Sequence, residues 1–95
     1  TGRTVTLTLD ISSNNTVTST TNIEISGMPS RLKPNGNWPS FVIVGVVNAV
    51  SVSSLAQVRA DTGAIRVFAS VTGSNFTSGN TNCGWGLVNI TYQIL

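Results

Sequence analysis

The chain has 95 residues, a formal net charge of +2 and 8% charged residues, against about 25% in an average soluble domain. This length predicts a single domain over residues 1–95. The absence of histidine excludes Ser-His-Asp and Cys-His catalytic arrangements, and one cysteine, Cys83, excludes an intrachain disulfide. The three acidic residues form no metal-binding or glycosidase pattern. We therefore expect no enzyme, no catalytic residue, no cofactor and no metal.

Neutral hydrogen-bonding residues take the place of the missing charges, with 13 Thr, 12 Ser and 10 Asn. This composition is typical of extracellular, viral or sugar-facing β proteins, although a composition bias of the source would also produce it. The five basic residues are scattered, so we expect no nucleic-acid binding. No apolar stretch approaches the roughly 20 residues that span a bilayer, so we expect no membrane insertion. A domain this small, without a disulfide or metal, commonly gains stability by associating with copies of itself.

The first half of the chain alternates between apolar and polar residues. Residues 5–11 predict a half-buried strand with an apolar face and a Thr face. Residues 12–15 are a turn cluster, and residues 17–26 predict a second strand. Residues 27–39 hold three prolines and two glycines, which predicts a long connection without regular structure. The apolar run 41–48 predicts a strand buried on both faces, by the core and by a neighbouring subunit.

The second half contains the clearest local signal. Residues 56–60 and 64–71 flank a Gly-containing turn at 61–63, which predicts a β-hairpin. Residues 72–86 predict a polar loop, and residues 87–95 predict a final strand. No segment has convincing helical spacing. The sequence therefore predicts an all-β fold, an antiparallel β-sandwich or jelly roll of about six to eight strands.

One face of the predicted hairpin combines an aromatic ring with planar polar groups, as saccharide sites often do. In the expected register Gln57, Arg59, Arg66 and Phe68 share this face, and Trp85 opens the last strand. We take these five as the candidate ligand-binding residues. The alternative is that Phe68, Trp85 and the other tryptophan, Trp38, pack in the core or in an interface.

Several pieces of the chain also have a recognisable order. The amphipathic strand 5–11 precedes the loop Gly27-Met28-Pro29-Ser30-Arg31-Leu32-Lys33-Pro34, the apolar strand 41–48, the hairpin strand 64–68 and the terminal strand 89–95. In this order they resemble the C-terminal head domains of bacteriophage receptor-binding proteins, such as those at the tail tips of siphophages that infect lactococci.

The resemblance implies a homotrimeric β-sandwich head at the end of a longer fibre, located extracellularly at the distal tail of a virion. It further implies binding of host cell-surface saccharide near the subunit interfaces, with Gln57, Arg59 and Phe68 in the sugar site. The chain lacks the His and acidic residues that some of those hairpins carry, which leaves the identity of the ligand open.

Two other functions remain open. The domain could be a C-terminal trimerisation cap of a tailspike or fibre, or a lectin or adhesin subunit of a bacterial surface fibre. Replacing Phe68 or Arg59 would abolish cell binding and spare the trimer in a receptor-binding head, but would affect only assembly in a cap. Elongated repetitive segments upstream would separate a phage fibre from a bacterial adhesin.

Overall fold

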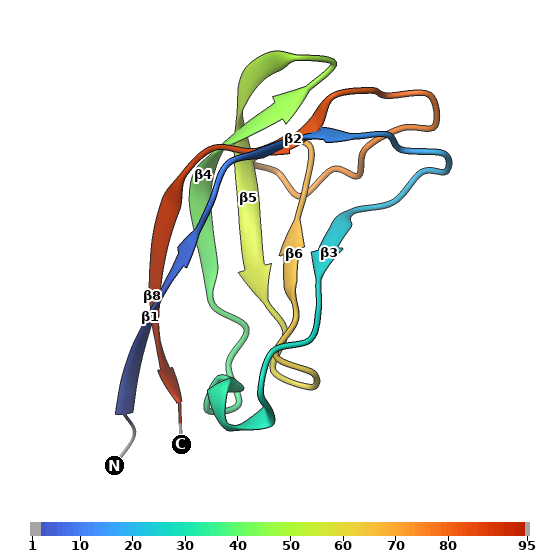
Figure 1. Ribbon diagram of the computed structural model, residues 1–95. Helices are drawn as coiled ribbons and strands as arrows, with labels where there is room; N and C mark the ends of the chain where they lie inside the picture. Colours follow the sequence, from blue (N-terminus) through green and yellow to red (C-terminus); the bar gives the residue numbers. More distant parts are fainter. Residues whose placement is uncertain (1–2, 95) are drawn as a thin grey trace.

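The computed structural model describes residues 3–94 and confirms the predicted all-β, sandwich-like fold (Figure 1). Every strand pairing is antiparallel. The eight strands are β1 (Arg3–Leu9), β2 (Ser12–Asn15), β3 (Ile23–Ile25), β4 (Ser40–Val47), β5 (Val50–Val58), β6 (Ile65–Val67), β7 (Cys83–Trp85) and β8 (Val88–Ile94). A short 3-10 turn, η1 (Ser30–Leu32), lies in the proline-rich connection. Residues 3–94 include no helix long and apolar enough to cross a membrane.

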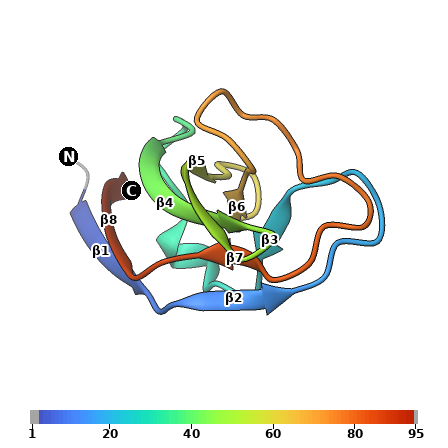
Figure 2. The ribbon, with the colours of Figure 1, turned by 90° about the horizontal axis from the view of Figure 1, so that it is seen from above.

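The strands form a six-stranded sheet, in the order β2-β7-β4-β5-β6-β3, and a two-stranded sheet of β1 and β8. β1 runs on into β2, and β7 runs on into β8, so both long strands pass from one sheet to the other. Leu9 pairs with Val88 in the small sheet, and Ser12 pairs with Trp85 in the large one. Seen from above, the sheets curl into a half-barrel (Figure 2).

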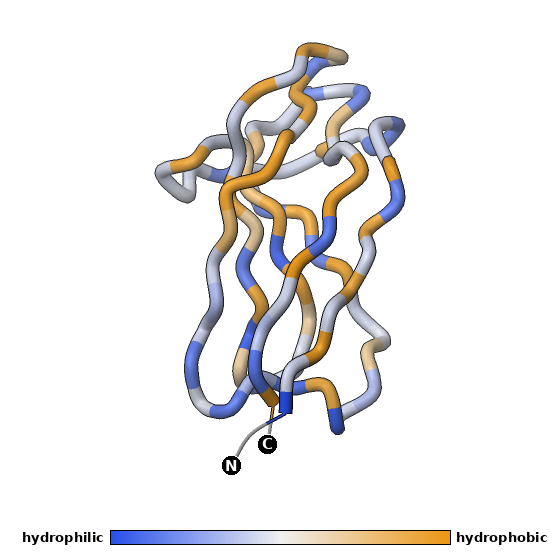
Figure 3. The backbone as a smooth tube through the Cα atoms, turned by 90° about the vertical axis from the view of Figure 1, so that its left-hand side faces the viewer, coloured by the Kyte–Doolittle hydropathy of each residue, from blue (hydrophilic) through white to orange (hydrophobic). Residues whose placement is uncertain are grey.

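The core consists of two apolar clusters. One lies between the two sheets and the other between the six-stranded sheet and the connections at its far end. The first contains Leu9, Val58, Ile65, Ile90, Tyr92 and Ile94, and the second contains Val17, Ile43, Ala56, Val67, Phe76 and Cys83. Apolar and polar residues alternate along β1 and β8, the strands beside the chain ends marked N and C in Figure 3, because successive side chains of a strand point to opposite faces.

β4 and β5 form a hairpin that was not predicted from the sequence. Its turn residues, Asn48 and Ala49, have φ angles of 50° and 64°, as in a two-residue type I′ turn. β5 therefore begins at Val50 and not at residue 56, with serines interrupting its apolar pattern. The predicted β5–β6 hairpin is confirmed, and its loop closes through the Arg59 amide, which donates to the Ala64 carbonyl over 2.8 Å.

Two predictions about the sheet edge were wrong. Residues 12–15 form β2 and not a turn, and Cys83–Trp85 forms β7 inside the predicted loop. The two short strands pair with each other, and the Asn15 side chain donates to the Cys83 carbonyl, 68 residues away, over 2.9 Å. A Cβ at Gly84 would overlap the Ser12 carbonyl oxygen, so glycine permits this approach. Tertiary pairing thus overrides the weak strand propensity of Ser, Asn and Gly.

Two predicted strands were too long. The strand expected over 17–26 is only β3, because Val17 and Thr21 bond instead to Asn80 and Phe76 of the later connection. The strand expected over 64–71 ends at Val67, because residues 69–74 turn back through a bond from the Ala69 amide to the Ser74 carbonyl. Phe76 itself is fully buried, although it lies in the predicted polar loop.

The apolar run 41–48 is confirmed as a strand, β4, with different environments on its two faces. Ile43 lies in the core, whereas Val42 and Val44 are 68% and 57% exposed. Within one chain β4 is therefore covered on its inner face only, and the neighbouring subunit expected on its outer face remains a prediction.

Candidate functional site

The predicted polar face of the β5–β6 hairpin lies on the outer side of the six-stranded sheet. Arg66 of β6 stands opposite Gln57 of β5 on one side and Glu24 of β3 on the other. Arg59 follows β5 on the same face and reaches Glu24 with its Nη1, which donates over 3.3 Å. The structure therefore brings Gln57, Arg59 and Arg66 together, as the hairpin register predicted.

Arg59 is held in place mainly by Asp61 in the hairpin loop. Its Nε and Nη2 donate to the two carboxylate oxygens of Asp61 over 2.9 and 2.6 Å. These hydrogen bonds lower the pKa of Asp61 from 3.8 to about 2 and raise the pKa of Arg59. Arg66 is less tightly bound, since its Nε lies 3.9 Å from Glu24. Two cations and two anions thus form one nearly neutral cluster.

Trp38 completes this cluster from the proline-rich connection. The guanidinium carbons of Arg59 and Arg66 lie 5.9 and 5.5 Å from the centre of its ring, within the range of a cation–π interaction. The side chain is 42% exposed. The predicted site did not include Trp38, because nothing in a loop of prolines and glycines indicates which strand the loop will cross.

A groove of about 290 Å³ runs beside Trp38, between the connection and β8. Its lining combines three aromatic rings with neutral hydrogen-bonding side chains and has no charged residue. The lining residues are Asn35, Asn37, Trp38, Pro39, Ser40, Phe41, Thr91, Tyr92 and Gln93. The Tyr92 hydroxyl donates to the Leu32 carbonyl over 2.8 Å, and burial raises its pKa. Ser40 pairs with Gln57, which makes the groove continuous with the predicted hairpin face.

The two remaining candidates, Phe68 and Trp85, lie in different places. Phe68 follows β6 and is half-buried, and its amide donates to the Leu55 carbonyl over 2.9 Å. Strand alternation puts it on the face of Arg66. Trp85 packs against both core clusters, and its indole Nε1 donates to the Asp10 carbonyl over 2.7 Å. The structure does not bring Trp85 together with the other four residues.

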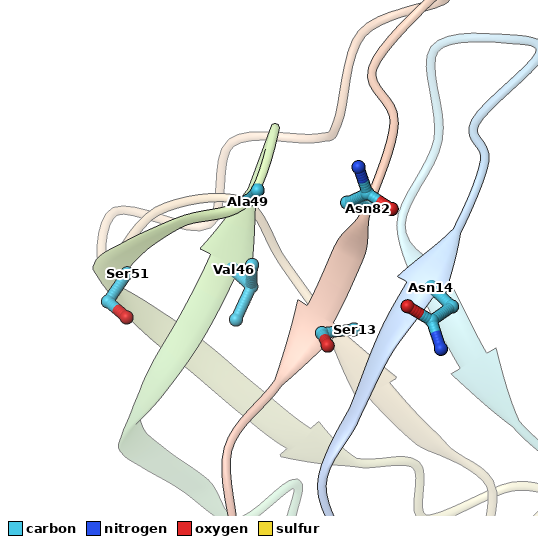
Figure 4. Close-up of a pocket in the computed structure, with 6 residues that line it drawn as sticks. All are labelled: Ser13, Asn14, Val46, Ala49, Ser51 and Asn82. Carbon is cyan, nitrogen blue, oxygen red and sulfur yellow. The ribbon is translucent and has the colours of Figure 1, made fainter.

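A second hollow, of about 300 Å³, lies at the opposite end of β4, beside the β4–β5 turn (Figure 4). Its lining is small and neutral, and it contains no aromatic side chain. The lining residues are Ser13, Asn14, Val46, Ala49, Ser51 and Asn82. The hollow therefore offers hydrogen bonds but no ring surface on which a ligand could stack.

The groove beside Trp38 is suited to binding by stacking and hydrogen bonding. Amide side chains supply both donors and acceptors, and the indole ring supplies an apolar face. Within residues 3–94 no three Cys, Asp or Glu residues gather closely enough to hold a metal ion. In comparisons with known proteins, no family model and no curated protein matches this chain.

Proposed function

We propose that this domain binds a saccharide in the groove beside Trp38. The observation that carries the proposal is the lining itself, which places the exposed indole next to Asn35, Asn37 and Gln93. Sugars present apolar C–H faces between hydroxyl groups, so a ring face with planar amides around it matches both parts of their surface. Gln57 and the two arginines extend the site along the outer face of the sheet.

The resemblance described above supports a more specific role. We place the domain at the C-terminal end of a phage tail fibre, as a homotrimeric head that recognises a saccharide on the host cell surface. A shallow neutral groove gives weak affinity at each site. Three sites on one fibre end would raise the overall avidity through effective concentration.

The proposal is tested by replacing Trp38 with alanine and measuring saccharide binding on a glycan array, followed by titration calorimetry with the best glycan. We expect at least a tenfold weaker affinity, about 1.4 kcal/mol of binding free energy, because the ring face is lost. Asn14→Ala, in the hollow at the other end of β4, is the matched control and should bind as the parent protein does. Equal binding by both variants, or no glycan bound by the folded parent, would contradict the proposal.

The exposed valines favour a second candidate function, that of an assembly domain. Val42 and Val44 point outward from the middle of the six-stranded sheet, and no charged residue pairs with them on the neighbouring β5. In this case the face would bury itself against other copies of the chain and the groove would have no ligand. A threefold mass by light scattering without any bound glycan would favour this second function, and a mass near 9.9 kDa would contradict it.

A further inference from the structure

The edge of β1 that faces away from β8 has no strand partner in the described chain. β1 pairs with β8 through seven consecutive residues, Arg3–Leu9, with no shift of register. On its other side it pairs with no strand of the described chain. An unpaired edge presents a row of backbone donors and acceptors, to which another strand can add.

The other strand edges carry features that discourage such pairing. β2 is short and has an irregular register with its neighbour. β3 has three residues, and Glu24 stands in its middle. The outer edge of β8 is partly covered, because Pro34 forms a bridge with Ile94 and the Asn35 amide donates to the Gln93 carbonyl over 3.2 Å. Of the four strands that end the two sheets in the described chain, β1 alone is long and regular and has no bridge along its outer edge.

The small sheet also lacks the strands that would make it stable by itself. A two-stranded antiparallel ribbon is marginal in water, and three or more strands with an apolar face are the usual minimum. Val5 and Leu7 pack against the core but stay only partly buried. Thr4, Thr6 and Thr8 cover the opposite face and are exposed. The sheet would gain hydrogen bonds and burial from additional strands beside β1.

We propose that β1 pairs with β1 of a second copy of this chain, antiparallel and about a two-fold axis at Thr6. The product is a continuous four-stranded sheet in which β8 of each copy forms an outer strand. Residues directly opposite each other in an antiparallel pair share one face of the sheet. Centring on Thr6 sets Thr opposite Thr on the solvent face and Val5 opposite the partner's Leu7 on the core face, so similar side chains meet across the centre of the pair.

The charges at the two ends of β1 favour an antiparallel pair of two copies of the strand. Arg3 begins the strand, and Asp10 directly follows its last residue. An antiparallel pair centred on Thr6 places each Arg3 opposite the partner's Leu9, next to the partner's Asp10. Arg3 and the partner's Asp10 then lie at neighbouring positions at each end of the pair, on opposite faces of the sheet, and the attraction between their unlike charges favours this orientation. A parallel pair would instead place the like charges of the two copies together.

Cysteine cross-linking tests the pairing and its centre. In Thr6→Cys the two new thiols would lie on residues with Cα atoms about 4.5–5.5 Å apart, within the range of a disulfide. Thr8→Cys is the matched control, because Thr6 and Thr8 are both exposed and each makes one side-chain hydrogen bond to β8. The two copies of residue 8 would be about 14 Å apart. The native Cys83 is buried.

We expect mild oxidation to give a disulfide-linked dimer with Thr6→Cys and none with Thr8→Cys.

As a second measurement, Thr6→Lys puts like charges at the two-fold axis and should halve the molar mass measured by light scattering. Halving is expected whether the starting species is a dimer or two joined trimers. Cross-linking of both cysteine variants, of neither, or of Thr8→Cys alone would overturn the proposal, as would an unchanged mass in folded Thr6→Lys. Neither readout depends on a saccharide, so failure here is separate from failure of the proposed function.

Discussion

The β4–β5 hairpin has an inner and an outer face that differ in how closely they are packed. On the inner face Gly45 and Ser54 are buried, and the Ser54 hydroxyl occupies the space where a Gly45 side chain would begin. On the outer face Val42 and Val44 stand in solvent, and Gln57 lies beside the Trp38 groove. Both faces follow the same alternation of side chains along the two strands.

The two faces therefore constrain substitutions in different ways. Substitutions on the inner face meet fixed neighbours and change the stability of the fold. Substitutions on the outer face meet solvent, so they should leave the stability of the fold nearly unchanged. This outer face carries the proposed saccharide contacts at one end and the candidate assembly surface in the middle.

The largest expected effect follows from adding one methyl group to the inner face. A Cβ at Gly45 would overlap the Ser54 hydroxyl and lie 2.6 Å from Ser54 Cβ. We expect Gly45→Ala to lower the free energy of unfolding by about 3 kcal/mol, the upper range for overpacked cores, as measured by urea denaturation. Adding Ser54→Gly removes both clashing atoms and should recover much of the loss. A double variant no more stable than the single one would refute this account of the inner face.

Removing the hydroxyl of Ser54 by itself should have the opposite sign. Its oxygen is buried and finds no hydrogen-bond partner within the described residues. Because an unsatisfied buried hydroxyl is costly, we expect Ser54→Ala to raise the free energy of unfolding by about 1 kcal/mol. Ser53→Ala, at the exposed neighbouring position, is the control for strand propensity. A destabilised Ser54→Ala variant would show that the hydroxyl contributes to packing.

The outer face should tolerate polar substitution. We expect the double variant Val42→Thr, Val44→Thr to change the free energy of unfolding by no more than about 0.5 kcal/mol, because both side chains are largely exposed and threonine keeps the branched shape. If this face joins copies of the chain, the same variant should reduce the molar mass measured by light scattering. A large stability loss in a protein that is already monomeric would contradict the division between the two faces.

The smallest expected effect concerns the ion pair at the edge of the outer face. The pKa of Asp61 is lowered to about 2 by Arg59, so the folded state favours the ionised carboxylate. The associated stabilisation is present above pH 4 and is lost as the pH falls through about 2. Thermal unfolding of the parent and Asp61→Asn should therefore differ at pH 5 and converge near pH 2. A difference independent of pH would exclude this origin.

The candidate site could be predicted only in part. Gln57, Arg59 and Arg66 were placed together correctly because a hairpin with a short turn has a register that its own residues fix. Trp38 and the groove were missed because they depend on where the connection crosses β8, which no local pattern encodes. Trp85 was placed with the site although it packs against the core, since a ring next to a glycine-rich loop has the same appearance in either role.

The sequence by itself determined the elements whose signal is local. These are the strands β1 and β8, whose period of two follows from strand geometry, the continuous apolar strand β4, and the β5–β6 hairpin with its Gly-containing turn. Only the tertiary structure decided that β2 and β7 are strands, that Phe76 is core, and which faces and edges remain uncovered. Those outcomes depend on pairings between distant residues, whose energy no short segment contains.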